Sequence, residues 1–265
     1  MKGTVKYDVK DGVAILTVDN PPVNPLSDGV RNGLFESLNK AEEDSSVTGV
    51  VLTGNGRAFI AGADISEFGG NVEGVSLNEV FNKLENCPKP VVAAINGIAL
   101  GGGLETALCC NYRIADKGAF VGLPEVNLGL LPGGGGTQRL PRLIGPSEAL
   151  KMMLSGSHVQ AKKALDMGIV DKISENVVEE SINFIKEVAE NTKTHPKVRD
   201  NNEKMIEARG NENVLLEAQA IASKGRKGQF APGQIIKCVE AAINLDDFDE
   251  GLKKEGEYFL ECLLH

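Results

Sequence analysis

The chain has 265 residues, of which 42% are hydrophobic and 25% charged, and its formal net charge is −9. These proportions are ordinary for a soluble globular protein, and the length suits one large domain or a domain with a smaller appendage. The negative charge argues against a nucleic-acid-binding role, which usually needs an excess of basic residues.

The amino-terminal segment carries charges throughout, which is not typical of a signal peptide. No apolar run approaches the roughly 20 residues that span a bilayer. The cysteines show no CxxC pair and are odd in number, so we expect reduced thiols in an intracellular protein. Cys109 and Cys110 lie in an apolar helical run and are expected to pack in the core. The scattered histidines predict neither a His-based triad nor a metal site.

The first half of the chain predicts strands that alternate with helices. Residues 5–9 and 13–19 alternate around a Lys-Asp-Gly turn and predict a β-hairpin. Ser27 is expected to cap the next helix, whose apolar residues recur at helical spacing. The predicted elements that follow are a buried strand over 48–56, a helix over 76–86, a strand over 89–97, a helix over 103–111 and strands at 112–116 and 119–122.

The second half predicts helices. Helical patterns occupy residues 146–156, 160–168, 177–190 and the tail from residue 233, and the segment 192–202 is the expected seam. The sequence therefore predicts the α/β class, with an α/β core over residues 1–195 and a helical C-terminal region over 196–265.

Three consecutive glycines, Gly101 to Gly103, stand where a strand should pass into a helix. Glycine lets a ligand approach the main chain, and the helix start offers free N–H groups and a positive dipole end. One interpretation is a phosphate loop, but the chain contains neither GxGxxG nor GK[ST]. The other is an oxyanion hole, whose second donor is predicted at Ala63, where a strand breaks at Ala61-Gly62.

Two glutamates are candidates for proton transfer. Glu105 follows the glycine run, and Glu125 comes twenty residues later in the apolar sequence Leu-Pro-Glu-Val. A carboxylate in apolar surroundings has a raised pKa and exchanges protons near neutral pH. The alternative for Glu125 is an exposed acid in a turn.

Two further stretches are left with two interpretations each. The glycines at 133–136 form either a flexible loop or a closely packed backbone near the site. The basic run KGRK at 224–227 is either a solvated loop or a contact for an anionic group of a ligand.

The motifs AGADI at 61–65, NGIALGGGLE at 96–105 and GLPEVNLGLLPGGGGTQRLPR at 122–142 resemble those of the crotonase, or enoyl-CoA hydratase/isomerase, superfamily. Within it, the chain looks most like the amino-terminal half of the peroxisomal bifunctional β-oxidation enzymes. This resemblance implies a crotonase-like spiral of ββα repeats with a helical C-terminal region. The chain departs from those enzymes in the loop at 133–136, where they usually carry a pair of bulkier residues.

By resemblance, the substrate is a trans-2-enoyl-CoA thioester and the activity is hydration. The resemblance assigns the oxyanion N–H groups to Ala63 and Gly102 and the catalytic carboxyls to Glu105 and Glu125. No cofactor or metal is expected beyond the coenzyme A that the substrate carries. The residues expected to line the substrate path are Ala61, Gly62, Asp64, Ile65, Gly101 and Pro124.

Several alternatives stay open at this point. The same oxyanion hole would serve Δ3-Δ2-enoyl-CoA isomerisation, alone or beside hydration, and a non-catalytic RNA-binding relative is a third reading. We expect no nucleic-acid partner and no membrane span, and either a monomer or a homo-oligomer such as a trimer or hexamer. A peroxisomal location is suggested by the resemblance, although the chain ends at His265 without a SKL-like tripeptide.

Overall fold

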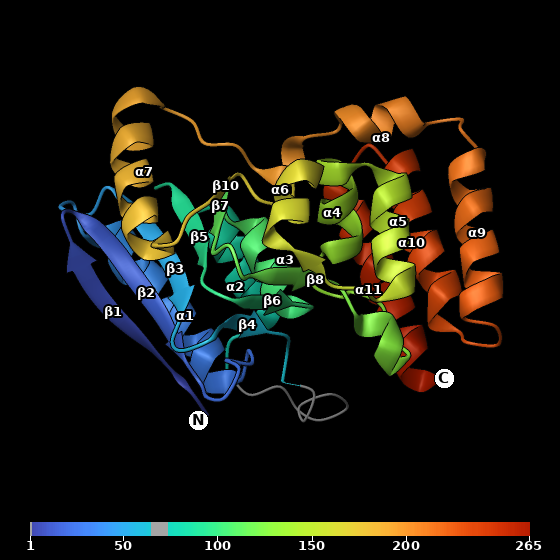
Figure 1. Cartoon of the computed structure of the whole chain (residues 1–265), viewed down its shortest axis with the longest axis horizontal. Helices are drawn as coiled ribbons and strands as arrows, with labels where there is room; N and C mark the ends of the chain where they lie inside the picture. The colour runs from blue at the N-terminus through green and yellow to red at the C-terminus, as the bar shows by residue number, and fades with distance from the viewer. Residues whose placement is uncertain (1, 65–73) are drawn as a thin grey trace. The chain divides into compact units, whose positions relative to one another are not determined.

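The computed structural model describes residues 2–64 and 74–265 and divides the chain into two compact units (Figure 1). The sheet unit comprises residues up to 121 and 160–197, and the helical unit comprises residues 122–159 and 198–265. Relative to the predicted division at 195, residues 122–159 group with the C-terminal helices. The change of unit at 197 falls inside the expected seam.

A six-stranded sheet in the order β1-β2-β3-β5-β7-β10 forms the centre of the sheet unit. β1 and β2 pair antiparallel, which confirms the predicted hairpin, and the other neighbours pair parallel. β3 and β5 are buried along their whole length, as parallel strands covered on both faces require. The strands are β1 (Thr4–Lys10), β2 (Val13–Asp19), β3 (Gly49–Gly54), β5 (Val91–Ile95), β7 (Tyr112–Ala115) and β10 (Lys172–Ile173).

A second sheet has the order β4-β6-β8-β9, with β4 (Ala58–Ala61), β6 (Ile98–Leu100), β8 (Phe120–Gly122) and β9 (Val159–Gln160). The chain runs β3, β4 and α2 (Leu77–Glu85), then β5, β6 and α3 (Gly102–Cys109). Each strand–strand–helix repeat gives one strand to each sheet, and this confirms the predicted spiral of ββα repeats. β6 was not predicted because it is only three residues long and lies between glycines.

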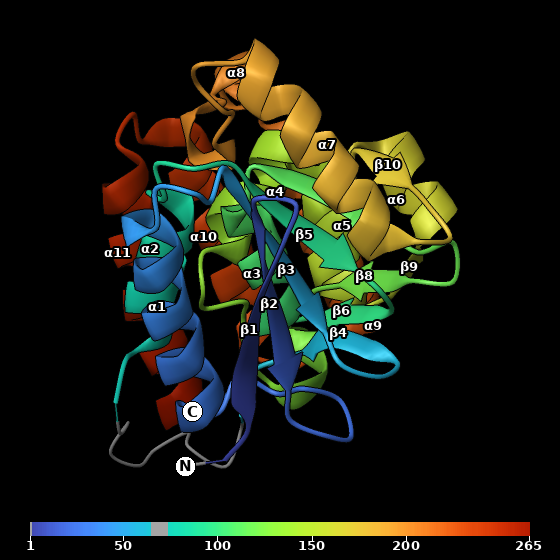
Figure 2. The same ribbon diagram turned by 90° about the vertical axis from the view of Figure 1, so that its left-hand side faces the viewer.

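Two helices cover opposite faces of the six-stranded sheet, as Figure 2 shows. α7 (Val177–Asn191) packs Ile182 and Ile185 against a cluster that includes Val51 and Val92. α1 (Asp28–Glu43) lies over the face that carries Val5. Successive strand residues point to opposite faces, so the two helices bury alternate positions of the same strands. α6 (Ala161–Met167) completes the described helices of this unit.

Ser27 stands at the predicted cap position of α1, but it does not cap the helix. Its side chain accepts no hydrogen bond from the first turn, and its hydroxyl instead donates to the carbonyl of Lys2. The Asp28 carboxylate accepts from the Lys2 N–H at 2.9 Å. The hydroxyl that the sequence assigned to the helix cap is therefore bonded to Lys2, which precedes β1. Ser76 and Glu79, in contrast, form a complete capping box on α2.

The helical unit contains the predicted helices at 146–156 and in the C-terminal tail. It also contains α8 and α9, which lie in the predicted helical region 196–265 but were not predicted individually, and α4, which was not predicted. α4 begins inside the glycine run and contains Pro141, two features that weaken a helical pattern. The elements are η2 (Glu125–Leu128), α4 (Gly136–Ile144), α5 (Pro146–Ser155), η3 (Val198–Asp200), α8 (Glu203–Ala208), α9 (Asn213–Gly225), α10 (Ala231–Asn244) and α11 (Phe248–Leu264).

The cysteines are free thiols, as expected. Cys109 and Cys110 are 3% and 1% exposed, so they belong to the core. Burial raises the pKa of the Cys110 thiol to about 12. Within residues 2–64 and 74–265, no helix is long and apolar enough to cross a membrane.

Candidate active site

The three glycines at the start of α3 are each required for a different structural reason, Gly101 as the N-cap and Gly102 and Gly103 as the first helical residues. Gly101 has φ +54° and ψ −127°, a conformation that a side chain would strain. A Cβ on Gly102 would lie 3.2 Å from the backbone nitrogen of Ala63. A Cβ on Gly103 would lie 1.8 Å from the carbonyl oxygen of Ile60, which leaves no space for any side chain. The glycines therefore let the start of α3 lie directly against β4 and the residues after it.

Ala63 lies where the strand β4 has ended, as the sequence predicted. Gly62 follows β4 with φ +95° and turns the chain. The Gly62 carbonyl accepts from the N–H of Leu26 at 3.0 Å, in an isolated parallel bridge between Leu26 and Ala63. In the described part of the chain, the Ala63 N–H donates no backbone hydrogen bond. The Ala63 N–H is thus available. It lies beside Gly102, which belongs to the first turn of α3, where backbone N–H groups lack intrahelical partners.

Glu105 lies in the first turn of α3 and is 4% exposed. Its backbone N–H donates to the Gly101 carbonyl at 3.0 Å and closes the first helical bond. At the other end of α3, the buried guanidinium of Arg113 donates to the carbonyls of Ala107 at 3.4 Å and Cys110 at 2.8 Å. A cation at the C-terminus of a helix stabilises it through the helix dipole. α3 is therefore fixed at both ends by contacts within the sheet unit.

Glu125 is the first residue of η2, a 3-10 helix of four residues that Pro124 precedes in the helical unit. Its carbonyl accepts from the N–H of Leu130 at 3.1 Å. The side chain is half-buried, so Glu125 is not the fully exposed turn acid of the alternative interpretation. Glu105 and Glu125 belong to different units, and their meeting at one substrate stays a prediction.

The remaining predicted residues fall into three groups, and Pro124 alone belongs to the helical unit. Ala61, Gly62, Asp64 and Gly101 belong to the sheet unit, around the contact of Gly102 with Ala63. Ile65 lies outside the described residues. The role of all these residues in lining the substrate path stays a prediction.

The glycines at 133–136 are closely packed. A Cβ on Gly133 would lie 2.6 Å from the ring of Phe259 on α11. The Glu255 carboxylate, one turn earlier on α11, accepts from the N–H of Gly135 at 2.6 Å and of Thr137 at 3.1 Å. An anionic side chain at these N–H groups stabilises the start of α4. The flexible-loop interpretation is therefore wrong, and helix α11 holds this segment.

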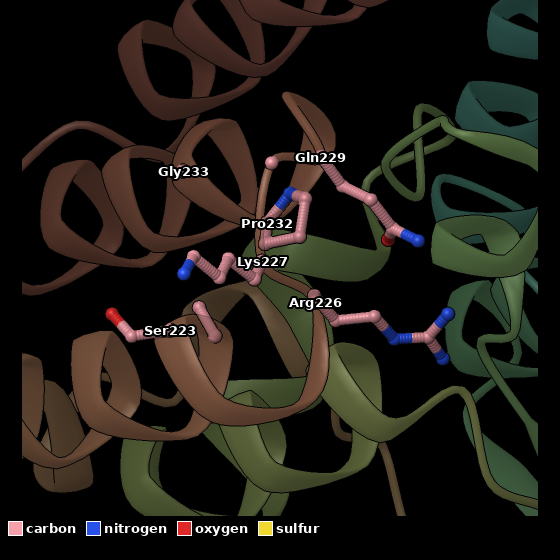
Figure 3. A pocket seen from close by; sticks show the side chains of 8 residues that line it. Ser223, Arg226, Lys227, Gln229, Pro232 and Gly233 are labelled. Carbon is pink, nitrogen blue, oxygen red and sulfur yellow. The ribbon is translucent and has the colours of Figure 1, made fainter.

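The basic residues of the run at 224–227 lie in different environments. It borders an open pocket of about 420 Å³, lined by Ala222, Ser223, Arg226, Lys227, Gly228, Gln229, Pro232 and Gly233. Figure 3 shows that the Arg226 side chain extends away from Lys227 and Ser223. Its guanidinium donates to the carbonyls of Leu154 and Ser155 and to the Asn127 side chain. Arg226 is thus a structural contact, whereas Lys224 and Lys227 are exposed.

Sequence reasoning missed one residue at these sites and did not foresee the contacts of another. The side chain of Leu26 would lie 3.2 Å from a Cβ on Gly102, so it borders the predicted oxyanion hole. The other is Arg226, whose hydrogen bonds reach the segment that bears Glu125. No local pattern around either residue indicates these contacts, because both partners are distant in the sequence.

The chain matches known proteins along most of its length. The family model described as enoyl-CoA hydratase/isomerase matches residues 8–235. A peroxisomal bifunctional enzyme of Danio rerio is 42% identical over 94% of this chain and 34% of its own length. A probable enoyl-CoA hydratase of Bacillus subtilis (strain 168) is 46% identical over 63% of this chain and 67% of its own length. The chain thus spans about a third of the bifunctional relatives and about two thirds of the bacterial one.

Solved structures share the fold. An enoyl-CoA hydratase/isomerase from Pseudoalteromonas atlantica T6c is 25% identical, covers 99% of this chain and 92% of its own, and gives a TM-score of 0.72. An enoyl-CoA hydratase from Bacillus anthracis is 31% identical over 96% of both chains, with a TM-score of 0.67. The fold and the motifs around Ala63, Gly102 and the glutamates define a crotonase-type protein. The chain belongs to the enoyl-CoA hydratase/isomerase family, and it is similar to about a third of the length of the peroxisomal bifunctional enzymes.

Proposed function

We propose that the chain is an enoyl-CoA hydratase, which adds water to trans-2-enoyl-CoA to give 3-hydroxyacyl-CoA. The observation that carries the proposal is the contact between two chain segments, where the helix start at Gly102 lies beside the available N–H of Ala63. Two N–H donors that converge on one oxygen can hold the thioester carbonyl of the substrate.

In this proposal the oxyanion hole acts on the transition state. When water adds across C2=C3, negative charge develops on the thioester oxygen. The N–H groups of Ala63 and Gly102 stabilise that charge, together with the positive end of the α3 dipole. Loss of one such donor typically lowers the rate by about 10²–10³-fold. The amides are fixed before the reaction, because Gly103 seats α3 against the carbonyl of Ile60.

Glu105 and Glu125 carry the proton transfers in the proposed reaction. One carboxylate takes a proton from the attacking water as its oxygen bonds to C3, and the other carboxyl gives a proton to C2. The net result is one water added per substrate. Both glutamates take part in proton transfer, and experiment decides which one acts as the base and which as the acid.

The test measures hydration of crotonyl-CoA from the loss of its ultraviolet absorbance. We expect Glu105→Gln and Glu125→Gln each to lower kcat by about 10²-fold or more, since acid–base catalysis contributes about 10²–10⁴-fold. Glu187→Gln is the matched control, because Glu187 is exposed on α7. Full activity of both active-site variants would overturn the mechanism, and an inactive wild type would overturn the hydratase assignment.

Δ3-Δ2-enoyl-CoA isomerisation is the second proposed activity. The family model covers both reactions, and a thioester enolate held by the same oxyanion hole is an intermediate that both can use. One glutamate can move a proton between C2 and C4, so Glu105→Gln should reduce isomerisation less than hydration. An assay with 3-enoyl-CoA tests this expectation, and no conversion by the wild type would leave hydration alone.

The relatives also support a place in fatty-acid β-oxidation and, through the peroxisomal bifunctional enzymes, a peroxisomal location. We further propose that no cofactor is needed beyond the coenzyme A of the substrate. Addition of a metal chelator should then leave hydration unchanged. Sedimentation of the chain in solution tests the choice between monomer, trimer and hexamer.

A further inference from the structure

The segment that bears Glu125 has little support of its own. η2 contains four residues, Glu125–Leu128, and ends at Gly129 in the left-handed conformation. A short 3-10 helix has poor hydrogen-bond geometry and seldom holds its position alone. Side-chain contacts with neighbouring elements of the helical unit therefore contribute to its orientation.

Asn127 supplies one of these contacts. It lies two residues after Glu125, and its amide donates to the Gly156 carbonyl at 3.4 Å. Gly156 ends α5 with φ +65°, and a Cβ there would lie 2.7 Å from the Asn127 side chain. The Asn127 side chain thus packs directly over the C-terminus of α5. The position of η2 is thereby coupled to the end of that helix.

Arg226 fixes this junction from a third element. Its Nε donates to the Leu154 carbonyl at 3.1 Å, and its Nη2 donates to the Ser155 carbonyl at 2.7 Å. The same Nη2 donates to the Asn127 side-chain oxygen at 2.6 Å. A cation at the last carbonyls of a helix is favoured by the helix dipole. One guanidinium therefore joins η2, the end of α5 and the segment between α9 and α10.

We propose that Arg226 is a positioning residue for Glu125, acting through Asn127. The proposal rests on the proposed function, because it assigns Glu125 to proton transfer. A planar guanidinium presents several donors in fixed directions, whereas a lysine ammonium is a flexible point charge. Arg226→Lys should therefore restore only part of what Arg226→Met loses.

The test compares Arg226→Met with Lys227→Met. The two residues are adjacent and border the same pocket, but Lys227 is exposed and makes no hydrogen bond with the described residues. We expect Arg226→Met to lower kcat for crotonyl-CoA by about tenfold to a hundredfold, the size of loss that a small misplacement causes. KM should change by less than about twofold, and Lys227→Met should change neither value. A loss confined to KM would overturn the proposal, because it would indicate a substrate contact in the pocket.

Hydrogen exchange gives a second readout that needs no activity. In Arg226→Met, amides of residues 122–130 should exchange faster than in the wild type, while those of α3 should not. Unchanged exchange at 122–130, or an unchanged kcat in an active enzyme, overturns the proposal. If the wild type proves inactive, the proposed function fails, and the exchange result alone decides whether Arg226 holds η2.

Asn127→Ala covers the case in which Arg226→Met does not fold. It removes the oxygen that accepts from Arg226 and the amide that donates to Gly156, but it leaves the bonds between Arg226 and the α5 carbonyls. The same loss of kcat is expected, and the double variant should lose no more than about the larger single loss, because both residues act on one contact. Fully additive losses would overturn the coupling.

Discussion

The two glutamate-bearing segments are held in different ways. α3 carries Glu105, and it is seated by backbone contact with β4 and stabilised at its C-terminus by Arg113. η2 carries Glu125 and depends on Asn127, which Arg226 contacts from 99 residues further along the chain. The first segment is held by contacts of its own glycines, whereas in our proposal the second is held by a distant side chain. Changes around α3 should therefore damage the fold, and changes around η2 should damage the chemistry.

The largest expected effect comes from Gly103→Ala. The new Cβ would lie 1.8 Å from the Ile60 carbonyl oxygen, so α3 and β4 must move apart. Overpacking against backbone should lower the free energy of unfolding by about 3 kcal/mol or more and abolish hydration. Thermal denaturation with the activity assay measures both effects.

Gly256→Ala is the control for that change. Gly256 lies inside helix α11, and a Cβ there would meet no atom within 4 Å. Because alanine favours the helix, this variant should gain up to about 1 kcal/mol. A Gly103→Ala variant as stable as Gly256→Ala would contradict the tight seating of α3.

Arg113→Met should have the next largest effect. Arg113 is 3% exposed and donates to carbonyls at the end of α3 and to the Ile169 carbonyl at 3.0 Å. Its loss leaves buried acceptors without a donor and should cost about 3 kcal/mol of unfolding free energy. Chemical denaturation measures this, and the exposed Arg57→Met should stay within about 0.5 kcal/mol of the wild type. Equal stabilities would show that α3 does not need Arg113.

The variants at Arg113 and Arg226 should differ in which property they change, stability or kcat. Arg113→Met is expected to lower stability with little change in the kcat of the folded fraction. Arg226→Met is expected to lower kcat with little change in stability, because its contacts lie near the surface. The reverse pattern would contradict the difference between the two segments.

The smallest expected effect concerns His195, which lies far from both glutamates in sequence. Its Nδ1 lies 3.2 Å from the Tyr112 hydroxyl, and burial lowers the pKa of His195 below its ordinary value. A lowered folded pKa means that the folded state binds the proton less well than the unfolded state. The resulting stability is present above the unfolded pKa of about 6.5 and is lost as the pH falls below it.

A pair of melting curves checks this expectation. Between pH 8 and pH 5.5, the Tm of the wild type should fall more than that of His195→Asn, by about 1–2 °C. The difference is small because the imidazole is only half-buried. Hydration at pH 8 should be unchanged in the variant. An equal fall in both proteins would mean that His195 does not contribute.

Much of the fold could be predicted because its signals are local. The hairpin around Lys10-Asp11-Gly12, the strand 91–95 and the helix α7 all follow from periodicity and turn residues. The contact between the glycine run and the end of β4 brings the oxyanion candidates together, and their role stays a prediction. The bond from Ser27 to Lys2, the choice between the two interpretations of Gly133 and the contacts of Arg226 could not be predicted, because in each case the partner lies far away in the sequence.

The most direct test of the central claim is a crystal structure of the chain with a bound, unreactive acyl-CoA thioester. The account predicts the thioester oxygen at about 2.7–3.1 Å from the backbone nitrogens of both Ala63 and Gly102, the distance for oxyanion donors. It also predicts the carboxyls of Glu105 and Glu125 beside C2 and C3 of the acyl chain. A thioester oxygen bound elsewhere, or glutamates facing different cavities, would contradict it.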